Sequence, residues 1–264
     1  MNRVPPNPAV LCQLYLDAVL PCLSELVAED AFARDLTAGL NASIVFRVAG
    51  GPARSVHLRD GAVSSQPGSC SHPSIVLLFL SRAHLNAFFS GRKWALPLLA
   101  WGGWRIRVLK GFSTLAERLE AVLEGHEAVI STAAGRRLHA RLSLMAAGLG
   151  LPSLAAGDVV SREAFRSLPY GMASFTISSE QGATVWFDRQ LDTSRAGWSA
   201  PPRQAEVCIA FGDAETAFAA MRDQIDTMAA TASGQIVVDG LIPLADGLNF
   251  IMQRLRVYLQ PSKS

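Results

Sequence analysis

Residues 36–46 read LTAGLNASIVF, and residues 168–177 read LPYGMASFTI. Each stretch begins as the end of a helix, passes through a glycine suited to a left-handed C-cap, and continues as a β-branched and aromatic strand. Gly39 and Gly171 are 132 residues apart. The pair predicts that one structural unit occurs twice in the chain.

Other pairs of segments keep the same order and nearly the same spacing. Residues 75–81 (IVLLFLS) correspond to residues 207–213 (VCIAFGD), and each is predicted as a strand followed by a helix that Ser81 or Asp213 caps. Residues 106–119 (IRVLKGFSTLAERL) correspond to residues 236–248 (IVVDGLIPLADGL). Each of these is predicted as a strand, a turn at Gly111 or Gly240, and a closing helix. Two copies, about residues 35–123 and 165–259, follow from these matches.

Local signals place the remaining elements. Asp60-Gly61 predicts a hairpin turn, and Thr114 with Glu117 predicts a capping box at the start of the first closing helix. Residues 8–34 form an apolar helical preface that Pro21 is expected to kink or divide. Residues 125–164 form a helical linker, which is expected to break around residues 148–152 and to restart with Ser161 as N-cap.

These elements predict an α+β fold of two repeats. Each repeat has a mostly antiparallel sheet of about five strands with helices on one face, and the N-terminal helices and the helical linker are added to them. The predicted domains are residues 1–124, the linker 125–164, and residues 165–264.

The order of these elements, with residues 36–48, 74–92 and 111–119, resembles the sterol carrier protein type 2 family. The second copy shares the ending but has residues 226–233 where that family has a helix-closing glycine. The resemblance implies binding or transfer of sterols, fatty acids, acyl-CoAs or other lipids in a tunnel between sheet and helices. Bacterial relatives include accessory proteins that hold prenylated quinone precursors. A tandem arrangement departs from the family's usual single domain, so whether both copies bind stays open.

The composition excludes several classes of protein. The chain is 50% apolar and only 17% charged, against roughly 25% in ordinary soluble domains, so it has enough apolar surface to fold. The uncharged runs considered, residues 94–104 and 143–157, are shorter than the ~18 residues of a membrane span. Residues 1–10 (MNRVPPNPAV) lack the apolar core of a signal peptide. A soluble, cytoplasmic protein is therefore expected.

No constellation of catalytic or metal-ligating residues stands out. The four cysteines form no C-x-x-C pair, and the five histidines show no metal-ligand spacing. The motifs G-x-S-x-G, Walker A and G-x-G-x-x-G are absent. Residues 90–93 match S-x-x-K, but neither S-D-N nor K-T-G accompanies them. The sequence predicts a protein that is not an enzyme and holds no cofactor or metal.

Residues 91–110 (GRKWALPLLAWGGWRIRVLK) are the most unusual segment. Three of the five tryptophans lie here, within a stretch from Gly61 to Ala116 that has six basic residues and no acidic one. Tryptophan beside lysine and arginine suits a membrane interface with anionic lipid. The predicted headgroup contacts are Arg92, Lys93, Arg105, Arg107 and Lys110.

The alternative for this segment is ordinary packing. Trp94, Leu98 and Trp101 would then lie in the core, and Arg105 and Arg107 on the wet face of a strand. Nucleic acid is disfavoured as a partner because the chain, with a net charge of +2, lacks a long basic track.

The apolar helix faces allow the same two interpretations, core or cavity wall. On the second, the predicted lipid-binding residues are Leu85, Phe88, Phe89, Trp94, Leu98, Trp101, Trp104, Leu115, Phe218, Met221, Ile225, Met228, Leu241 and Leu244. The predicted function is non-catalytic binding or transfer of a sterol, fatty acyl or prenyl lipid, with membrane docking by the first repeat. The alternative is a scaffold or accessory subunit whose domains are filled and bind nothing. A protein partner or a homodimer fits either reading.

Overall fold

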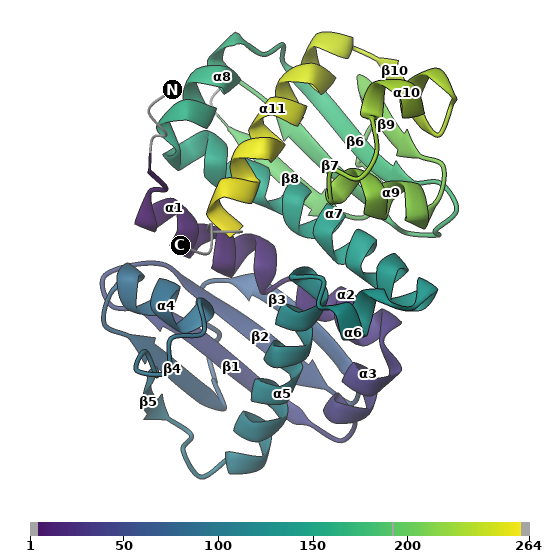
Figure 1. Cartoon of the computed structure of the whole chain (residues 1–264). Coiled ribbons are helices and arrows are strands. Elements are labelled where there is room, and N and C mark those ends of the chain that lie inside the picture. Colours follow the sequence, from purple (N-terminus) through teal and green to yellow (C-terminus); the bar gives the residue numbers. More distant parts are fainter. Residues whose placement is uncertain (1–4, 192, 260–264) are drawn as a thin grey trace. The chain divides into compact units, whose positions relative to one another are not determined.

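The computed structural model describes residues 5–191 and 193–259. The chain forms two compact units, one from Asn7 to Ala121 and one that begins at Val122. Each unit contains a five-stranded sheet with helices packed against it, which confirms the predicted α+β class (Figure 1). The signal-peptide expectation rests partly on residues 1–4, which lie outside the described residues.

Five strands form the first sheet: β1 (Asn41–Val48), β2 (Ala53–Arg59), β3 (Ala62–Pro67), β4 (Ile75–Phe79) and β5 (Leu98–Trp101). Their order is β3-β2-β1-β4-β5, and β1 pairs parallel with β4 while every other pair is antiparallel. Asp60 and Gly61 have φ angles of 43° and 81°, which confirms the predicted hairpin turn between β2 and β3.

Five strands form the second sheet: β6 (Gly171–Ile177), β7 (Thr184–Arg189), β8 (Ser194–Trp198), β9 (Val207–Phe211) and β10 (Ile236–Gly240). Read from the β8 edge, their order is β8-β7-β6-β9-β10, with β6 parallel to β9 and the other pairs antiparallel. The two sheets therefore have the same strand order and the same single parallel pair.

The helices of the first unit are α1 (Pro8–Leu14), the π-helix η1 (Tyr15–Val19), α2 (Cys22–Glu29), α3 (Ala31–Thr37), α4 (Arg82–Phe89) and α5 (Ile106–Leu123). Pro21 lies between η1 and α2 with helical backbone angles (φ −58°, ψ −29°), so the helical path continues from Pro8 to Glu29 and is not divided there. Ser81 caps α4, as expected, by accepting the His84 N–H. α1 packs against α4, and α2 packs against β3.

The helices of the second unit are α6 (Glu127–Ile130), α7 (Ala133–Gly157), α8 (Val159–Ser167), α9 (Ala214–Met221), α10 (Thr227–Ala232) and α11 (Ile242–Leu259). α7 packs against β7, β8 and α9, which is where the α1–α2 helices lie in the first unit. The residues predicted as a linker therefore pack on the second sheet as the opening helices of its unit.

An aspartate at the break between the opening helices marks the same point in both units. Asp30 caps α3 and accepts two hydrogen bonds from Arg118 of α5. Asp158 caps α8 and accepts hydrogen bonds from Arg254 of α11. In each unit the closing helix is thus tied to the opening helices by one arginine–aspartate pair, a likeness that the sequence matches did not include.

Both units also have a glycine at the end of the edge strand that pairs with the fourth strand of the sheet: Gly102 directly follows β5, and Gly240 is the last residue of β10. Gly102 and Gly240 have φ angles of 85° and 106°. A Cβ atom at Gly102 would lie 2.2 Å from the Ser74 carbonyl oxygen, and one at Gly240 would lie 2.1 Å from the Glu206 carbonyl oxygen. Only glycine permits both the dihedral angle and this close approach. Gly102, not Gly111, is therefore the counterpart of Gly240.

The predicted strand at Ile106 and turn at Gly111 are wrong. Residues 106–123 form one helix, so the closing helix does not begin at Thr114, whose hydroxyl donates to the Lys110 carbonyl inside the helix. The edge strand had already formed upstream as β5. Gly111 serves packing instead, since a Cβ atom there would lie 3.2 Å from a methyl carbon of Leu40.

Two other local predictions are corrected in the second unit. α7 runs unbroken through Gly148 and Pro152, because Gly148 lets the helix approach Val185 of β7 closely and the proline removes only one backbone hydrogen bond. The N-cap of α8 is Asp158, and Ser161 donates to it. Gly171, with φ of 148°, opens β6 and is not a helix C-cap, whereas Gly39, with φ of 70°, has the predicted left-handed conformation.

Among residues 5–191 and 193–259, one helical stretch, Pro8–Glu29, is long and apolar enough to cross a membrane by length and composition. An 18-residue window within it has a mean hydropathy of 1.6, and 61% of that window is buried inside the fold. The bent pair α7 and α8 passes the same test when taken together. Core helices of soluble proteins also satisfy this criterion, so the stretch is weak evidence for a span.

Candidate functional site

The segment around β5 leaves large apolar side chains in solvent. We call this group the β5 surface; its members are Leu80, Trp94, Leu96, Leu98, Leu99, Trp101, Trp104 and Ile106. Trp94, Leu96 and Trp104 are 70%, 69% and 68% exposed. The alternative in which Trp94, Leu98 and Trp101 pack into the core is therefore wrong. Clustered apolar exposure of this kind marks an interaction site more often than ordinary surface.

The position of β5 in the sheet explains this exposure. β5 is an edge strand, and all four of its residues are exposed. In register, Leu98 lies opposite Leu78 and, beyond a register shift, Trp101 lies opposite Val76, so these side chains share a face of the sheet. Leu99 lies opposite Leu77 and is exposed at the edge from the other face. Leu80 continues the same alternation just after β4 and is 62% exposed. Sequence reasoning missed Leu80, because residues 75–80 (IVLLFL) are all apolar and nothing in that run marks which side chains face solvent.

Trp101 and Trp104 form one aromatic pair. Their ring centroids are 5.1 Å apart with an interplanar angle of 79°, an edge-to-face contact. Gly102 brings them together, because its positive φ turns the chain sharply after β5. The pair remains exposed on its other sides.

Basic residues flank the β5 surface on both sides in the sequence. Arg92, Lys93, Arg105, Arg107 and Lys110 are all exposed. None of the five forms an ion pair within the part of the chain that the structure describes. Arg107 and Lys110 lie in the first turn of α5, where the helix dipole favours anions and disfavours cations. The positive potential of these side chains is thus uncompensated locally.

The other predicted lipid contacts in the first unit are buried or, at Phe88 and Phe89, half-buried. Leu85 and Leu115 are fully buried. Phe88 and Phe89 belong to an aromatic cluster in which centroids of contacting rings are 4.8–6.4 Å apart. The members of this cluster are Tyr15, Phe46, Phe79, Phe88, Phe89 and Phe112. These rings pack on one another between the first sheet and its helices.

The predicted lipid contacts of the second unit are not brought together on one surface. Phe218 and Leu244 are buried, and Met221, Ile225 and Leu241 are partly exposed. Met228 is 79% exposed on α10, a separate helix from α9, so residues 218–228 do not form one continuous helical face.

A buried histidine lies beside Phe218. The His139 ring donates through Nδ1 to the Val122 carbonyl at 2.6 Å and contacts the Phe218 ring edge-to-face. Burial lowers the pKa of His139, and the nearby Arg222 charge also lowers it, while the bond to Val122 acts in the opposite direction. The neutral ring is therefore the favoured form in the folded unit.

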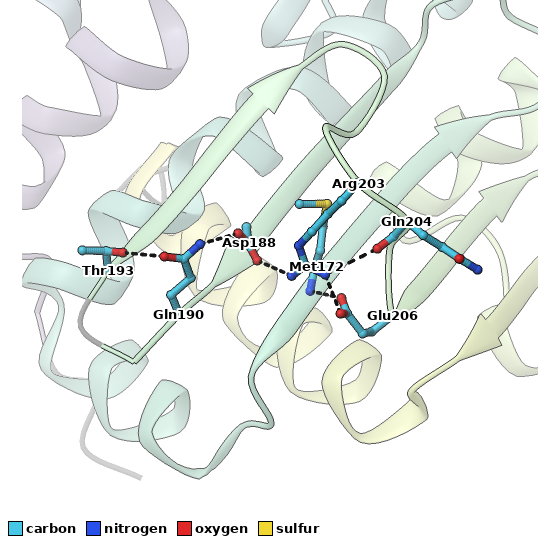
Figure 2. Close-up of polar contacts among 7 residues, drawn as sticks. All are labelled: Met172, Asp188, Gln190, Thr193, Arg203, Gln204 and Glu206. Carbon is cyan, nitrogen blue, oxygen red and sulfur yellow. Dashed lines mark hydrogen bonds and ion pairs between the residues drawn. The ribbon is translucent and has the colours of Figure 1, made fainter.

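A polar network holds the long connection before β9 (Figure 2). The Arg203 guanidinium donates to Asp188 of β7 at 2.8 Å and to Glu206 at 2.5 Å. Glu206 in turn accepts the Met172 backbone N–H, and this bond, with the pairing to Arg203, lowers the pKa of Glu206. Gln190 donates to the other Asp188 oxygen. Every charge here has a protein partner, so the network fixes residues 203–206 against the sheet.

A second buried carboxylate is the α8 cap. Burial raises the pKa of Asp158, but hydrogen bonds from Arg254, Tyr258 and Ser161 outweigh that effect and leave the pKa below its ordinary value.

No group of three or more histidine, cysteine, aspartate or glutamate side chains that could hold a metal ion occurs among residues 5–191 and 193–259. The β5 surface itself offers apolar side chains and positive charge.

Comparison with known proteins finds a likeness only among solved structures. No protein-family model matches the chain, and no curated protein matches it. Among solved structures, the chain is similar to the sterol carrier protein domain 2 of Helicoverpa armigera, with 11% identity and a TM-score of 0.34. The match covers 42% of this chain and 87% of that domain.

Proposed function

We propose that this chain is a non-catalytic lipid-binding protein that docks on anionic membrane surfaces through the β5 surface. One observation supports the proposal: exposed tryptophans and leucines are flanked in the sequence by five exposed cations that form no ion pair within the described part of the chain, and no acidic residue lies between Gly61 and Ala116. Moving apolar side chains out of water lowers the free energy, and tryptophan prefers the depth of lipid headgroups. A cation near an anionic leaflet adds on the order of 1 kcal/mol.

The edge position of β5 sets a limit on depth. An edge strand presents unpaired backbone N–H and C=O groups, and such groups are not tolerated in the hydrocarbon core. The proposed contact is therefore interfacial, with the tryptophan rings at headgroup level and the strand edge still hydrated. The protein would lie on the membrane and not span it.

The test is co-sedimentation with vesicles of phosphatidylglycerol and phosphatidylcholine in equal parts, compared with vesicles of phosphatidylcholine alone. We expect binding to the anionic vesicles, and a loss of about tenfold or more in Trp94→Ala/Trp101→Ala, because two exposed aromatic anchors are removed. Met228→Ala/Phe250→Ala is the matched control, since both side chains are exposed in the second unit. Equal binding by all three proteins would contradict the proposal.

A scaffold is the second candidate, and the aromatic cluster of the first unit favours it. Rings that pack on one another between sheet and helices are what a filled domain predicts. Organic extraction of the purified protein, followed by mass spectrometry, separates the two. Carriage of a lipid inside the unit predicts a co-purifying apolar molecule, whereas a filled scaffold predicts none.

A further inference from the structure

One imidazole joins two members of the β5 surface that come from different segments. The Leu80 backbone N–H donates to His84 Nδ1 at 3.2 Å, and His84 Nε2 lies 3.1 Å from the Leu96 carbonyl oxygen. Leu80 follows β4, whereas Leu96 lies in the loop before β5. His84 itself is held in the first turn of α4, where its N–H bonds Ser81, and its ring meets the Phe79 ring edge-to-face.

These two contacts require one protonation state. A neutral imidazole has one N–H and one acceptor nitrogen. Because Nδ1 accepts from Leu80, the proton must be on Nε2, which then donates to the Leu96 oxygen. A protonated ring has an N–H at both nitrogens and loses its acceptor, so the Leu80 contact becomes a meeting of two donors.

Among the described elements around α4, the carboxylate that comes closest to being available is Asp17 of η1, whose neighbour Tyr15 stacks on Phe89. Asp17 already pairs with Arg54. α4 contributes Arg82 besides His84 itself, and the loop of residues 91–97 contributes Arg92 and Lys93. β4 has no titratable group, and α1, which packs against α4, has only Cys12. Protonation would therefore add a positive charge among cations, and the ring would gain no partner for the bond that it loses.

We propose that His84 is the positioning residue of the β5 surface: its neutral ring holds Leu80 and Leu96 in the arrangement that docks, and its protonation releases the loop and weakens docking. This inference rests on the proposed function. Because both contacts need the neutral ring, a pH series tests the inference.

The sign of the effect makes it testable. Added positive charge by itself predicts tighter binding to anionic vesicles at lower pH, whereas loss of the bridge predicts weaker binding. We expect the affinity of the wild-type chain for vesicles of phosphatidylglycerol and phosphatidylcholine in equal parts to fall about tenfold between about pH 7.5 and about pH 5.5.

Variants separate His84 from the other histidines. His84→Gln cannot be protonated in this range, and its affinity should not fall on acidification. His84→Ala should bind about tenfold more weakly than wild type already at about pH 7.5, since both contacts are gone. His57→Gln, on β2, is the matched control and should keep the wild-type pH profile. A wild-type affinity that rises on acidification in parallel with His84→Gln would overturn the inference.

A second measurement keeps the two proposals distinguishable. If the wild-type chain binds no vesicle at any pH, the proposed function fails. The Leu80 amide then reports on the bridge directly in hydrogen exchange without lipid. Its protection factor should fall on acidification in wild type and be low at all pH values in His84→Ala. A protection factor that is the same in both proteins would overturn the role of His84.

Discussion

The segment that follows the fourth strand and its helix differs sharply between the two units. In the first unit, residues 91–110 contain three tryptophans, five basic residues and no acidic one. In the second, residues 222–246 contain no tryptophan, four aspartates and one arginine. Both segments include the edge strand of a sheet with the same strand order. The fold thus fixes where an edge lies, and the sequence of that edge decides what it contacts.

Charge reversal gives the largest expected effect on this comparison. Replacing Arg92, Lys93, Arg105 and Arg107 by glutamate should weaken binding to anionic vesicles by about a thousandfold or more, because four attractive charges become repulsive. The measurement is co-sedimentation at fixed ionic strength. Arg162→Glu/Arg195→Glu changes two exposed arginines of the second unit and should leave binding within about threefold of wild type. Equal losses in both variants would mean that net charge, and not the β5 surface, directs binding.

The arginine–aspartate pairs of the two units should differ in strength. Asp158 and Arg254 have side chains only 2% and 10% exposed, whereas Arg118 is 31% exposed beside Asp30. Arg254→Met leaves a buried carboxylate without its cation and should lower the free energy of unfolding by about 3 kcal/mol. Arg118→Met should cost about 1 kcal/mol, since water reaches that pair.

Urea unfolding monitored by circular dichroism measures both values. If Arg118→Met costs as much as Arg254→Met, burial does not decide the strength of these pairs. Arg166→Met is the control, because its pair with Glu163 is exposed on both sides and should contribute little.

A smaller effect is expected on the pH dependence of the free energy of unfolding, and it comes from His139. The corresponding helices of the first unit, α1 and α2, contain no histidine. The unfolded chain, with histidine near the ordinary value of 6.5, takes up a proton before the folded chain, whose His139 pKa is lowered. The free energy of unfolding should therefore be unaffected well above that value and decrease as the pH falls below it.

The decrease should be on the order of 1 kcal/mol between about pH 7 and about pH 5. Denaturant titrations at several pH values measure it, and His139→Gln should show a flatter dependence. His126→Gln, at an exposed site, should keep the wild-type slope. If the free energy of unfolding of His139→Gln and of wild type has the same slope against pH, His139 does not cause this pH dependence.

Much of the fold could be predicted from local patterns. The strands before each N-cap, the Asp60-Gly61 hairpin and the caps at Ser81 and Asp213 depend on neighbouring residues, and the structure confirms them. Prediction failed at Ile106, where alternating Arg and apolar residues suited either a strand or a helix. Only the pairing of β5 with β4, a contact between distant residues, resolves that ambiguity.

The candidate site could be predicted only in part, because contacts between distant residues decide which side chains are exposed. The residue types of segment 91–110 indicated an interface, but the same residues also allowed packing in the core. The exposed position of β5 at the sheet edge decides between the two. Leu80 and the His84 bridge join segments on either side of α4, so no local pattern pointed to them. The Asp158–Arg254 pair spans 96 residues and was invisible for the same reason.

We propose that the β5 surface contacts the lipid headgroups, and fluorescence quenching by brominated lipids measures the depth of its tryptophans directly. A variant that retains only Trp101, with the other tryptophans replaced by phenylalanine, is mixed with phosphatidylglycerol vesicles that contain lipids brominated at different depths. We expect shallow bromines to quench Trp101 strongly and deep bromines to quench it weakly. A variant that retains only Trp198 of the second unit should show no quenching. Equal quenching of both variants, or no quenching of Trp101, would contradict the proposal.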